Sequence, residues 1–206
     1  MFFDGAHGPG MTALDLKDMG CDFYATCCHK WMCGPKGTGF LYVKKEMLDV
    51  LQARWVGGYS DLGWDVTVEP PEFKGLVPTA HRYDFATQNA AIYIGLGAAV
   101  DFLYHIGMDN IVRRGNALAT YLQNELLKLG DKIEMLTPTE ERSRGFVIGF
   151  RLKNMPYDQF GEHASKKGFR IRLVGESHLN SIRVSTHLYN SFDEVRQFVD
   201  TVKEVA

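Results

Sequence analysis

Apolar residues in the first quarter of the chain come in short runs separated by glycine turns. The runs Met1–Asp4, Asp22–Thr26 and Gly39–Val43 have the length and the apolar, aromatic-rich composition of strands. Helical spacing predicts a brief helix over 14–19 and a longer one over 46–53. Strands that alternate with helices in this way predict an α/β fold class for this part of the chain.

The middle of the chain has a different character. From Trp55 to Arg82, glycine, proline and aromatic residues follow no regular period, which predicts a long ordered loop that shapes a site or wraps around a partner. The stretch Asn89–Tyr104 is apolar on nearly all sides, so we expect a buried helix. Asp109 is expected to cap the next helix, which Gly130 ends.

The last part of the chain predicts a small α+β unit. Strands are expected over 146–150, 169–174 and 182–185, and a helix over 157–167. Ser191 and Glu194 form the sequence pattern of a capping box, which predicts the start of a final helix. We place the domain boundary within the second long helix, which gives one domain over 1–112 and another over 113–206.

Composition narrows the class of protein. A hydrophobic fraction of 45% and a charged fraction of 23% are ordinary for a soluble globular chain and exclude disordered, collagen-like and coiled-coil classes. The 23 basic and 25 acidic residues give a net charge of -2, so no overall attraction to nucleic acid or to an acidic membrane is expected. The longest apolar run, Ala90–Val100, is too short to span a bilayer, so we expect no membrane partner.

All four cysteines lie in one short stretch. They are Cys21, Cys27, Cys28 and Cys33. A disulfide framework would spread its cysteines along the chain, so this clustering indicates reduced thiols and a cytoplasmic location. Zinc is an alternative, with His29 as a further ligand, but structural zinc sites usually show two separated short pairs. We therefore expect no metal.

Two glycine-rich stretches are candidates for ligand binding. Gly8–Ala13 fits the G-x-G-x-x-A outline of a dinucleotide fingerprint, but Pro9 removes an N–H that a pyrophosphate could use. The more ordinary interpretation is a turn that enters a helix, and a nucleotide-binding module stays an alternative. Gly34–Gly39 lacks the G-K-[ST] ending of a phosphate-binding loop and indicates only a close backbone approach.

Two polar groups follow predicted strands. Asp4 ends the first strand, and His29, Lys30 and Trp31 come just after the second. Ligands of open α/β sheets bind outside the carboxyl ends of strands. A lysine there can act as a nucleophilic amine, and an acid beside it can hold a protonated pyridine nitrogen. A solvated lysine and a turn-forming aspartate are the ordinary alternatives.

Several segments in the same order resemble the class V aminotransferase family, which are pyridoxal-phosphate (PLP) enzymes of fold type I. The segments are 4–10, 22–24, 29–31, 34–41, 82–89 and 182–190. The branch most similar is isopenicillin N epimerase, with cysteine desulfurases and selenocysteine lyases as related branches. The resemblance implies the C-terminal part of a fold type I large domain followed by a small α+β domain. It also implies that this chain is the C-terminal half of such a protein, in line with its start at a strand end.

The resemblance also implies roles for residues that match the family's motifs. Lys30 would form the Schiff base with PLP and would then serve as the general base. Asp4 would hold the pyridinium nitrogen, which makes the ring an electron sink. His7 would lie beside the ring or its phenolic oxygen, and His29 would help to hold the phosphate.

Two further residues are implied by the same resemblance. Thr87 would reach the phosphate bound in a neighbouring subunit, which implies a homodimer. Arg183 would clamp the carboxylate of an amino-acid substrate. The implied activity is epimerase-like or aminotransferase-like.

The cysteine content weighs against one related activity. Desulfurases of the family need a nucleophilic cysteine shortly before the carboxylate-binding arginine, and Cys33 is the last cysteine here. Cys27 stands where many relatives place a phosphate-binding serine, so that role is not assigned to it. A cysteine desulfurase-like or selenocysteine lyase-like enzyme and a non-catalytic fragment stay as alternatives.

Overall fold

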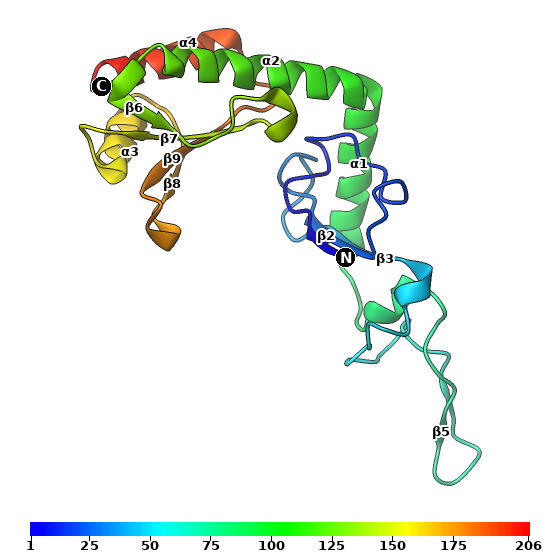
Figure 1. Ribbon diagram of the computed structural model, residues 1–206. Coiled ribbons are helices and arrows are strands. Elements are labelled where there is room, and N and C mark those ends of the chain that lie inside the picture. The colour runs from blue at the N-terminus through cyan, green and yellow to red at the C-terminus, as the bar shows by residue number, and fades with distance from the viewer. The chain divides into compact units, whose positions relative to one another are not determined.

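The computed structural model describes residues 1–206, which form two compact units, 1–105 and 106–206 (Figure 1). The boundary expected between 112 and 113 lies within helix α2 (Met108–Leu127) of the second unit. No single helix is long and apolar enough to cross a membrane; only helix α1 (Ala90–Ile106) taken together with α2 has the required length and composition.

The sheet of the first unit has the strands that the apolar runs predict. They are β1 (Phe2–Asp4), β2 (Phe23–Cys27) and β3 (Gly39–Val43), in the order β1-β2-β3. Strand β1 runs parallel to β2, with Asp4 opposite Ala25, and β2 runs antiparallel to β3. Because β1 and β2 are parallel, the residues that follow them leave the sheet at the same edge.

The helix expected over 14–19 is wrong: the segment is a series of turns. The carboxylate of Asp15 accepts the backbone N–H groups of Lys17 and Asp18 at 2.9 and 3.0 Å. These two bonds hold the pKa of Asp15 below its ordinary value. A short acidic side chain that binds local N–H groups in this way offers the backbone an alternative to the helix.

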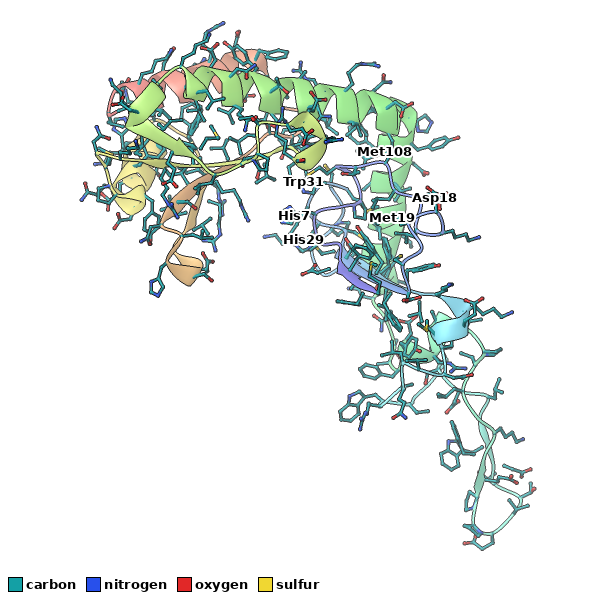
Figure 2. The ribbon with its side chains drawn as sticks, in the orientation of Figure 1. His7, Asp18, Met19, His29, Trp31 and Met108 are labelled. Atoms are coloured by element: carbon teal, nitrogen blue, oxygen red, sulfur yellow. The ribbon has the colours of Figure 1, made fainter.

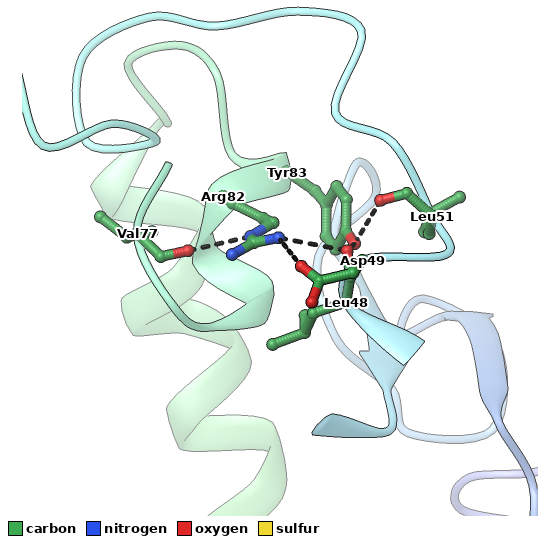
Figure 3. A network of polar contacts seen from close by, with 6 residues as sticks. All are labelled: Leu48, Asp49, Leu51, Val77, Arg82 and Tyr83. Atoms are coloured by element: carbon green, nitrogen blue, oxygen red, sulfur yellow. Dashed lines mark hydrogen bonds and ion pairs between the residues drawn. The ribbon is translucent and has the colours of Figure 1, made fainter. Parts of the chain in front are cut away.

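The helix predicted over 46–53 is absent: the structure has the 3₁₀ turn η1 (Lys45–Met47) followed by turns. The physical reason lies in a later segment of the chain. The Tyr83 hydroxyl donates to the carbonyls of Leu51 and Leu48 at 2.8 and 3.2 Å (Figure 3). The Leu48 carbonyl, which a helix over 46–53 would pair with the Gln52 N–H, is thus engaged by a distant part of the chain.

The long loop expected from Trp55 to Arg82 has internal structure. It contains a small hairpin, β4 (Trp64–Asp65) and β5 (Glu72–Phe73), with the Trp64 and Phe73 rings 5.0 Å apart. The loop ends in the 3₁₀ turn η2 (Ala80–Tyr83). Arg82 fastens this end, because its guanidinium donates to the carbonyls of Val77 and Leu48 (Figure 3).

Helix α1 (Ala90–Ile106) forms as its apolar sequence predicts, but its expected burial is wrong in this chain. Leu103 is its only buried residue, while Ile94 and Tyr104 are 76% and 81% exposed. The part that does pack lies near Gly95, where an added Cβ would come within 2.9 Å of the Pro35 ring. Much of the apolar surface of α1 stays exposed, including Val100 and Phe102.

The second unit is a four-stranded antiparallel sheet with helices on one face (Figure 1). Its strands, in the order β6-β7-β9-β8, are β6 (Ile133–Met135), β7 (Val147–Leu152), β9 (Ser181–Ser185) and β8 (Arg172–Val174). Its helices are α2, α3 (Tyr157–Lys166) and α4 (Phe192–Lys203). Three 3₁₀ turns complete it: η3 (Gly130–Lys132), η4 (Glu141–Ser143) and η5 (Glu176–His178).

The strand and helix predictions for this unit are confirmed apart from three details. The short strand β6 was not predicted, and β8 begins later than expected. Asp109 lies in the first turn of α2 and does not cap it, since Gly107 holds the N-cap position with no side-chain hydrogen bond. The predicted capping box is present: Ser191 Oγ accepts the Glu194 N–H at 3.1 Å, and the Glu194 carboxylate accepts the Ser191 N–H at 2.6 Å.

Alternation along β7 separates the core of this unit from its open face. Ile148 and Phe150 point into a core where the Phe160 ring of α3 meets both Phe150 and Phe198 of α4. Gly149 and Arg151 therefore lie on the opposite face, because successive side chains of a strand point to opposite sides.

Candidate active site

The candidate site lies at the edge of the sheet where β1 and β2 both end. The chain leaves β1 after Asp4, and the next N–H, from Gly5, donates to the carbonyl of Ala25 on β2 at 2.8 Å. Lys30 follows the end of β2, and its Nζ lies 3.2 Å from His7 Nε2. The parallel pairing therefore brings together two residues that are 23 positions apart in the sequence.

His7 is held from its other side by Trp31. The indole Nε1–H donates to His7 Nδ1 at 3.0 Å, and the ring centroids are 6.2 Å apart (Figure 2). Trp31 is only 4% exposed. Trp31 has no predicted role from the sequence, although a buried indole usually finds an acceptor for its N–H, which is a usable signal.

Backbone hydrogen bonds close the segment that carries Lys30 into a loop. The Cys28 N–H donates to the Thr38 carbonyl, and the Gly34 N–H donates to the Cys28 carbonyl, both at 2.9 Å. An added Cβ at Gly39 would lie 2.4 Å from the Thr26 carbonyl oxygen. The close backbone approach predicted for Gly34–Gly39 is thus made to the chain's own backbone.

A second glycine loop positions Asp4 and His7. A Cβ at Gly5 would lie 1.9 Å from the ring of buried Tyr24, and one at Gly8 would lie 2.0 Å from its hydroxyl oxygen. No helix follows Gly8–Ala13, which forms turns, so the dinucleotide fingerprint and the helix expected after it are wrong. These glycines provide room for Tyr24.

The hydroxyl groups of Tyr24 and Thr26, which lie beneath this loop, are both hydrogen-bonded. The Tyr24 hydroxyl donates to the Gly5 carbonyl at 3.3 Å, and Thr26 Oγ1 donates to the same oxygen at 2.9 Å. Burial raises the pKa of Tyr24, and the negative charge of Asp4 adds to the shift, so the phenol stays protonated and able to donate. Asp4 Oδ1 accepts the Ala6 N–H at 3.1 Å, and no ion pair joins Asp4 to Lys30.

The other predicted site residues do not join this cluster through hydrogen bonds. His29 precedes Lys30 in the chain and has an exposed side chain. Thr87 is exposed in the segment before α1. Arg183 belongs to the second unit, on the open face of its sheet, where it pairs in register with Gly149 and Arg172. Its Nε is buried and has no hydrogen-bond partner.

Comparison with solved structures defines the class of the fold. An apo cysteine desulfurase from Thermococcus onnurineus matches 98% of this chain with a TM-score of 0.87 at 24% identity. A cystine C-S lyase, C-DES, matches the same share with a TM-score of 0.85 at 22% identity. The fold is therefore that of PLP-dependent fold type I enzymes, and the chain covers 51% of each of these structures.

Sequence comparison identifies the family. The model of the family described as aminotransferase class-V matches residues 1–198. A cysteine desulfurase from Haloferax volcanii is 31% identical over 98% of the chain, and an isopenicillin N epimerase from Amycolatopsis lactamdurans is 30% identical over 98%. The chain belongs to the class V aminotransferase family, as the resemblance predicted. It spans about half the length of the curated relatives that it matches.

PLP is confirmed as the cofactor at the level of the family, and a solved C-DES variant carries glycine linked to it. The residues at the sheet edge fit this group in their chemistry. Lys30 supplies an amine for an aldehyde, Asp4 a carboxylate for a pyridine nitrogen, and His7 an imidazole within hydrogen-bond distance of the amine. Gly5 and Gly8 lack side chains, so the backbone that carries Asp4 and His7 can lie close against Tyr24 of the sheet.

Proposed function

We propose that this chain carries the lysine-bearing part of a PLP-dependent enzyme that acts on an amino acid, through a Schiff base at Lys30. The observation that supports it most directly is the 3.2 Å contact between Lys30 Nζ and His7 Nε2, beside the strand end that bears Asp4. Three groups of complementary chemistry at one edge of a sheet are hard to explain by solvation or turn formation alone.

In this proposal each residue has a defined task. Asp4 keeps the pyridine nitrogen protonated, and PLP, when bound, supplies an electron sink for the bonds at the substrate α-carbon. Lys30 would hold the cofactor through its aldehyde and, as a free amine, would take the substrate α-proton as general base. His7 lies beside the ring or its phenolic oxygen, and His29 contributes to phosphate binding.

Arg183 is the proposed clamp for the substrate carboxylate. A planar guanidinium offers two parallel N–H donors to a planar acceptor. Arg183 stands opposite Arg172 in the β8–β9 pair, and like charges in register destabilise a sheet. The Arg172 guanidinium is paired with Glu176. The buried Nε of Arg183 without a partner fits a side chain whose donors are meant for a ligand.

We favour epimerase-like or aminotransferase-like chemistry over desulfurase chemistry. The turn between β8 and β9, where desulfurases would need their nucleophile, contains no cysteine. Burial raises the pKa of the Cys28 thiol, which disfavours its reactive thiolate form.

Cysteine desulfurase-like or selenocysteine lyase-like activity is the second candidate. The names of several relatives favour it, including the Haloferax enzyme and a probable cysteine desulfurase from Streptomyces coelicolor at 31% identity. Incubation with PLP and cysteine distinguishes the two. Formation of alanine, with the sulfur recovered as sulfide when a thiol reductant such as dithiothreitol is added, supports the second candidate; no alanine, alongside α-proton exchange, supports the first.

A homodimer is part of the proposal. The exposed apolar surface of α1, with Ile94, Phe102 and Tyr104 outermost, is the kind of surface that an obligate partner covers. Thr87, in the exposed segment before α1, is proposed to reach the phosphate bound by the other subunit. Light scattering on the purified chain tests this: a monomer at all concentrations contradicts it. We place the enzyme in the cytoplasm.

Borohydride reduction in the presence of PLP tests the function directly. Peptide mapping should find the pyridoxyl group on Lys30, and Lys30→Ala should remove it, while Lys36→Ala, a change in the same loop, should leave it. Absence of label on Lys30 at every PLP concentration would show that this chain by itself does not bind the cofactor, as expected of a non-catalytic fragment.

A further inference from the structure

We propose that Trp31 is a positioning residue that holds His7 in the neutral form protonated on Nε2, the ring nitrogen that faces the amine of Lys30. The tautomer does not depend on the proposed function; its use in Schiff-base chemistry does.

The first step concerns the indole. A tryptophan side chain has one N–H and no acceptor, so the histidine nitrogen that faces it must accept. That nitrogen is His7 Nδ1, 3.0 Å from Trp31 Nε1. The indole is rigidly placed because Trp31 is 4% exposed and its backbone packs against Gly10, where an added Cβ would lie 2.5 Å from the Trp31 carbonyl.

The second step follows from the imidazole. A neutral ring carries one proton, and a lone pair on Nδ1 requires that proton on Nε2. An imidazolium would carry N–H groups on both nitrogens and would set Nδ1–H against the indole N–H. The contact with Trp31 thus favours the neutral ring over the charged one.

The third step concerns Lys30. Its Nζ lies 3.2 Å from Nε2, so the Nε2–H points at the amine nitrogen. An ammonium group has three donors and no acceptor, whereas an uncharged amine has a lone pair. The Nε2–H therefore lies beside the nitrogen that would attack the cofactor aldehyde.

Ring nitrogen NMR of the full chain tests the tautomer without any cofactor. Histidine is labelled with ¹⁵N, and the signals of His7 are assigned by their loss in His7→Asn. The expected spectrum shows a protonated Nε2 and an unprotonated Nδ1. Trp31→Phe should abolish this single tautomer and give a mixture or an imidazolium.

Two further variants identify the cause. Lys30→Met should keep the Nε2–H tautomer, because the indole is still present. Trp55→Phe removes an exposed tryptophan of the same unit and should leave the His7 signals unchanged.

A protonated Nδ1 in the unaltered chain overturns the proposal, as does an unchanged tautomer in Trp31→Phe or a changed one in Lys30→Met. If Trp31→Phe does not fold, the unaltered chain and Lys30→Met still decide the matter. Because no PLP is present, failure of this test is distinct from failure of PLP to label Lys30.

Discussion

The packing of Gly8 on the Tyr24 hydroxyl gives a sharp test of how the site loop is built. In Gly8→Ala the new Cβ would lie 2.0 Å from Tyr24 Oη, while the next neighbours, Leu14 Cδ1 and Tyr24 Cζ, would lie at 3.0 and 3.3 Å. One oxygen atom is therefore the main obstacle. The double variant Gly8→Ala with Tyr24→Phe should remove it.

The magnitude follows from the geometry. Ordinary contact begins at 3.4 Å, so the hydroxyl must move by about 1.4 Å. Tyr24 is only 3% exposed and cannot swing into solvent. Overpacking of this kind costs about 1–3 kcal/mol. Tyr24→Phe alone should cost about 1 kcal/mol or less, because the Gly5 carbonyl keeps its bond from Thr26 Oγ1 at 2.9 Å.

Tryptophan fluorescence during urea unfolding is the appropriate assay. Trp31, Trp55 and Trp64 are the only tryptophans of the chain, and all belong to the first unit. Their emission therefore reports the stability of that unit separately from the second. Gly58→Ala is the matched control, since its added Cβ meets nothing within 4 Å and should change stability by less than about 1 kcal/mol.

Gly5→Ala sharpens the comparison. Its Cβ would lie 1.9 and 2.1 Å from ring carbons of Tyr24, so removal of the hydroxyl should not relieve it. The reasoning is refuted if Tyr24→Phe rescues Gly5→Ala as well as Gly8→Ala, or if Gly8→Ala is as stable as Gly58→Ala.

Three other changes test the second unit and helix α1. Phe160→Ala should destabilise the second unit by about 3–5 kcal/mol, measured by far-UV circular dichroism, because the ring is fully buried; a loss below about 1 kcal/mol would contradict this. Ser191→Ala should cost about 1 kcal/mol through loss of the helix cap, and an unchanged urea midpoint would argue against the cap. Gly97→Ala should stabilise α1 by up to about 1 kcal/mol, since its Cβ has free space in a helix interior; destabilisation would show a hidden contact.

Acid titration gives a further prediction for the second unit. The hydrogen bond from Lys167 holds the pKa of Glu204 below its ordinary value. A carboxyl whose pKa is lower in the folded state stabilises the fold above its unfolded pKa, and this contribution is lost as the pH falls through the folded value. Glu204→Gln should therefore lose less stability on acidification than the unaltered chain. Equal acid sensitivity of the two would contradict a role for this pair.

Local pattern predicted the elements whose stability is local. The capping box at Ser191, the strand alternation of β7 and the apolar run of α1 each follow from neighbouring residues, and the structure has all three. The helices expected over 14–19 and 46–53 failed because other groups, the Asp15 carboxylate and the Tyr83 hydroxyl, take part in the hydrogen bonding. The second of these groups is distant in sequence, so no local pattern could reveal it.

The family could be predicted from the amino-acid sequence alone, since the motifs around Asp4 and Lys30 resemble those of the class V aminotransferases. The position of His7 between Lys30 and Trp31 could not be predicted, because that contact depends on the parallel pairing of β1 with β2. The three-dimensional structure was also needed to show that α1 leaves apolar surface uncovered in this chain. A hydrophobic pattern predicts that a surface is buried, but the element that covers this surface can lie far along the chain or belong to another molecule.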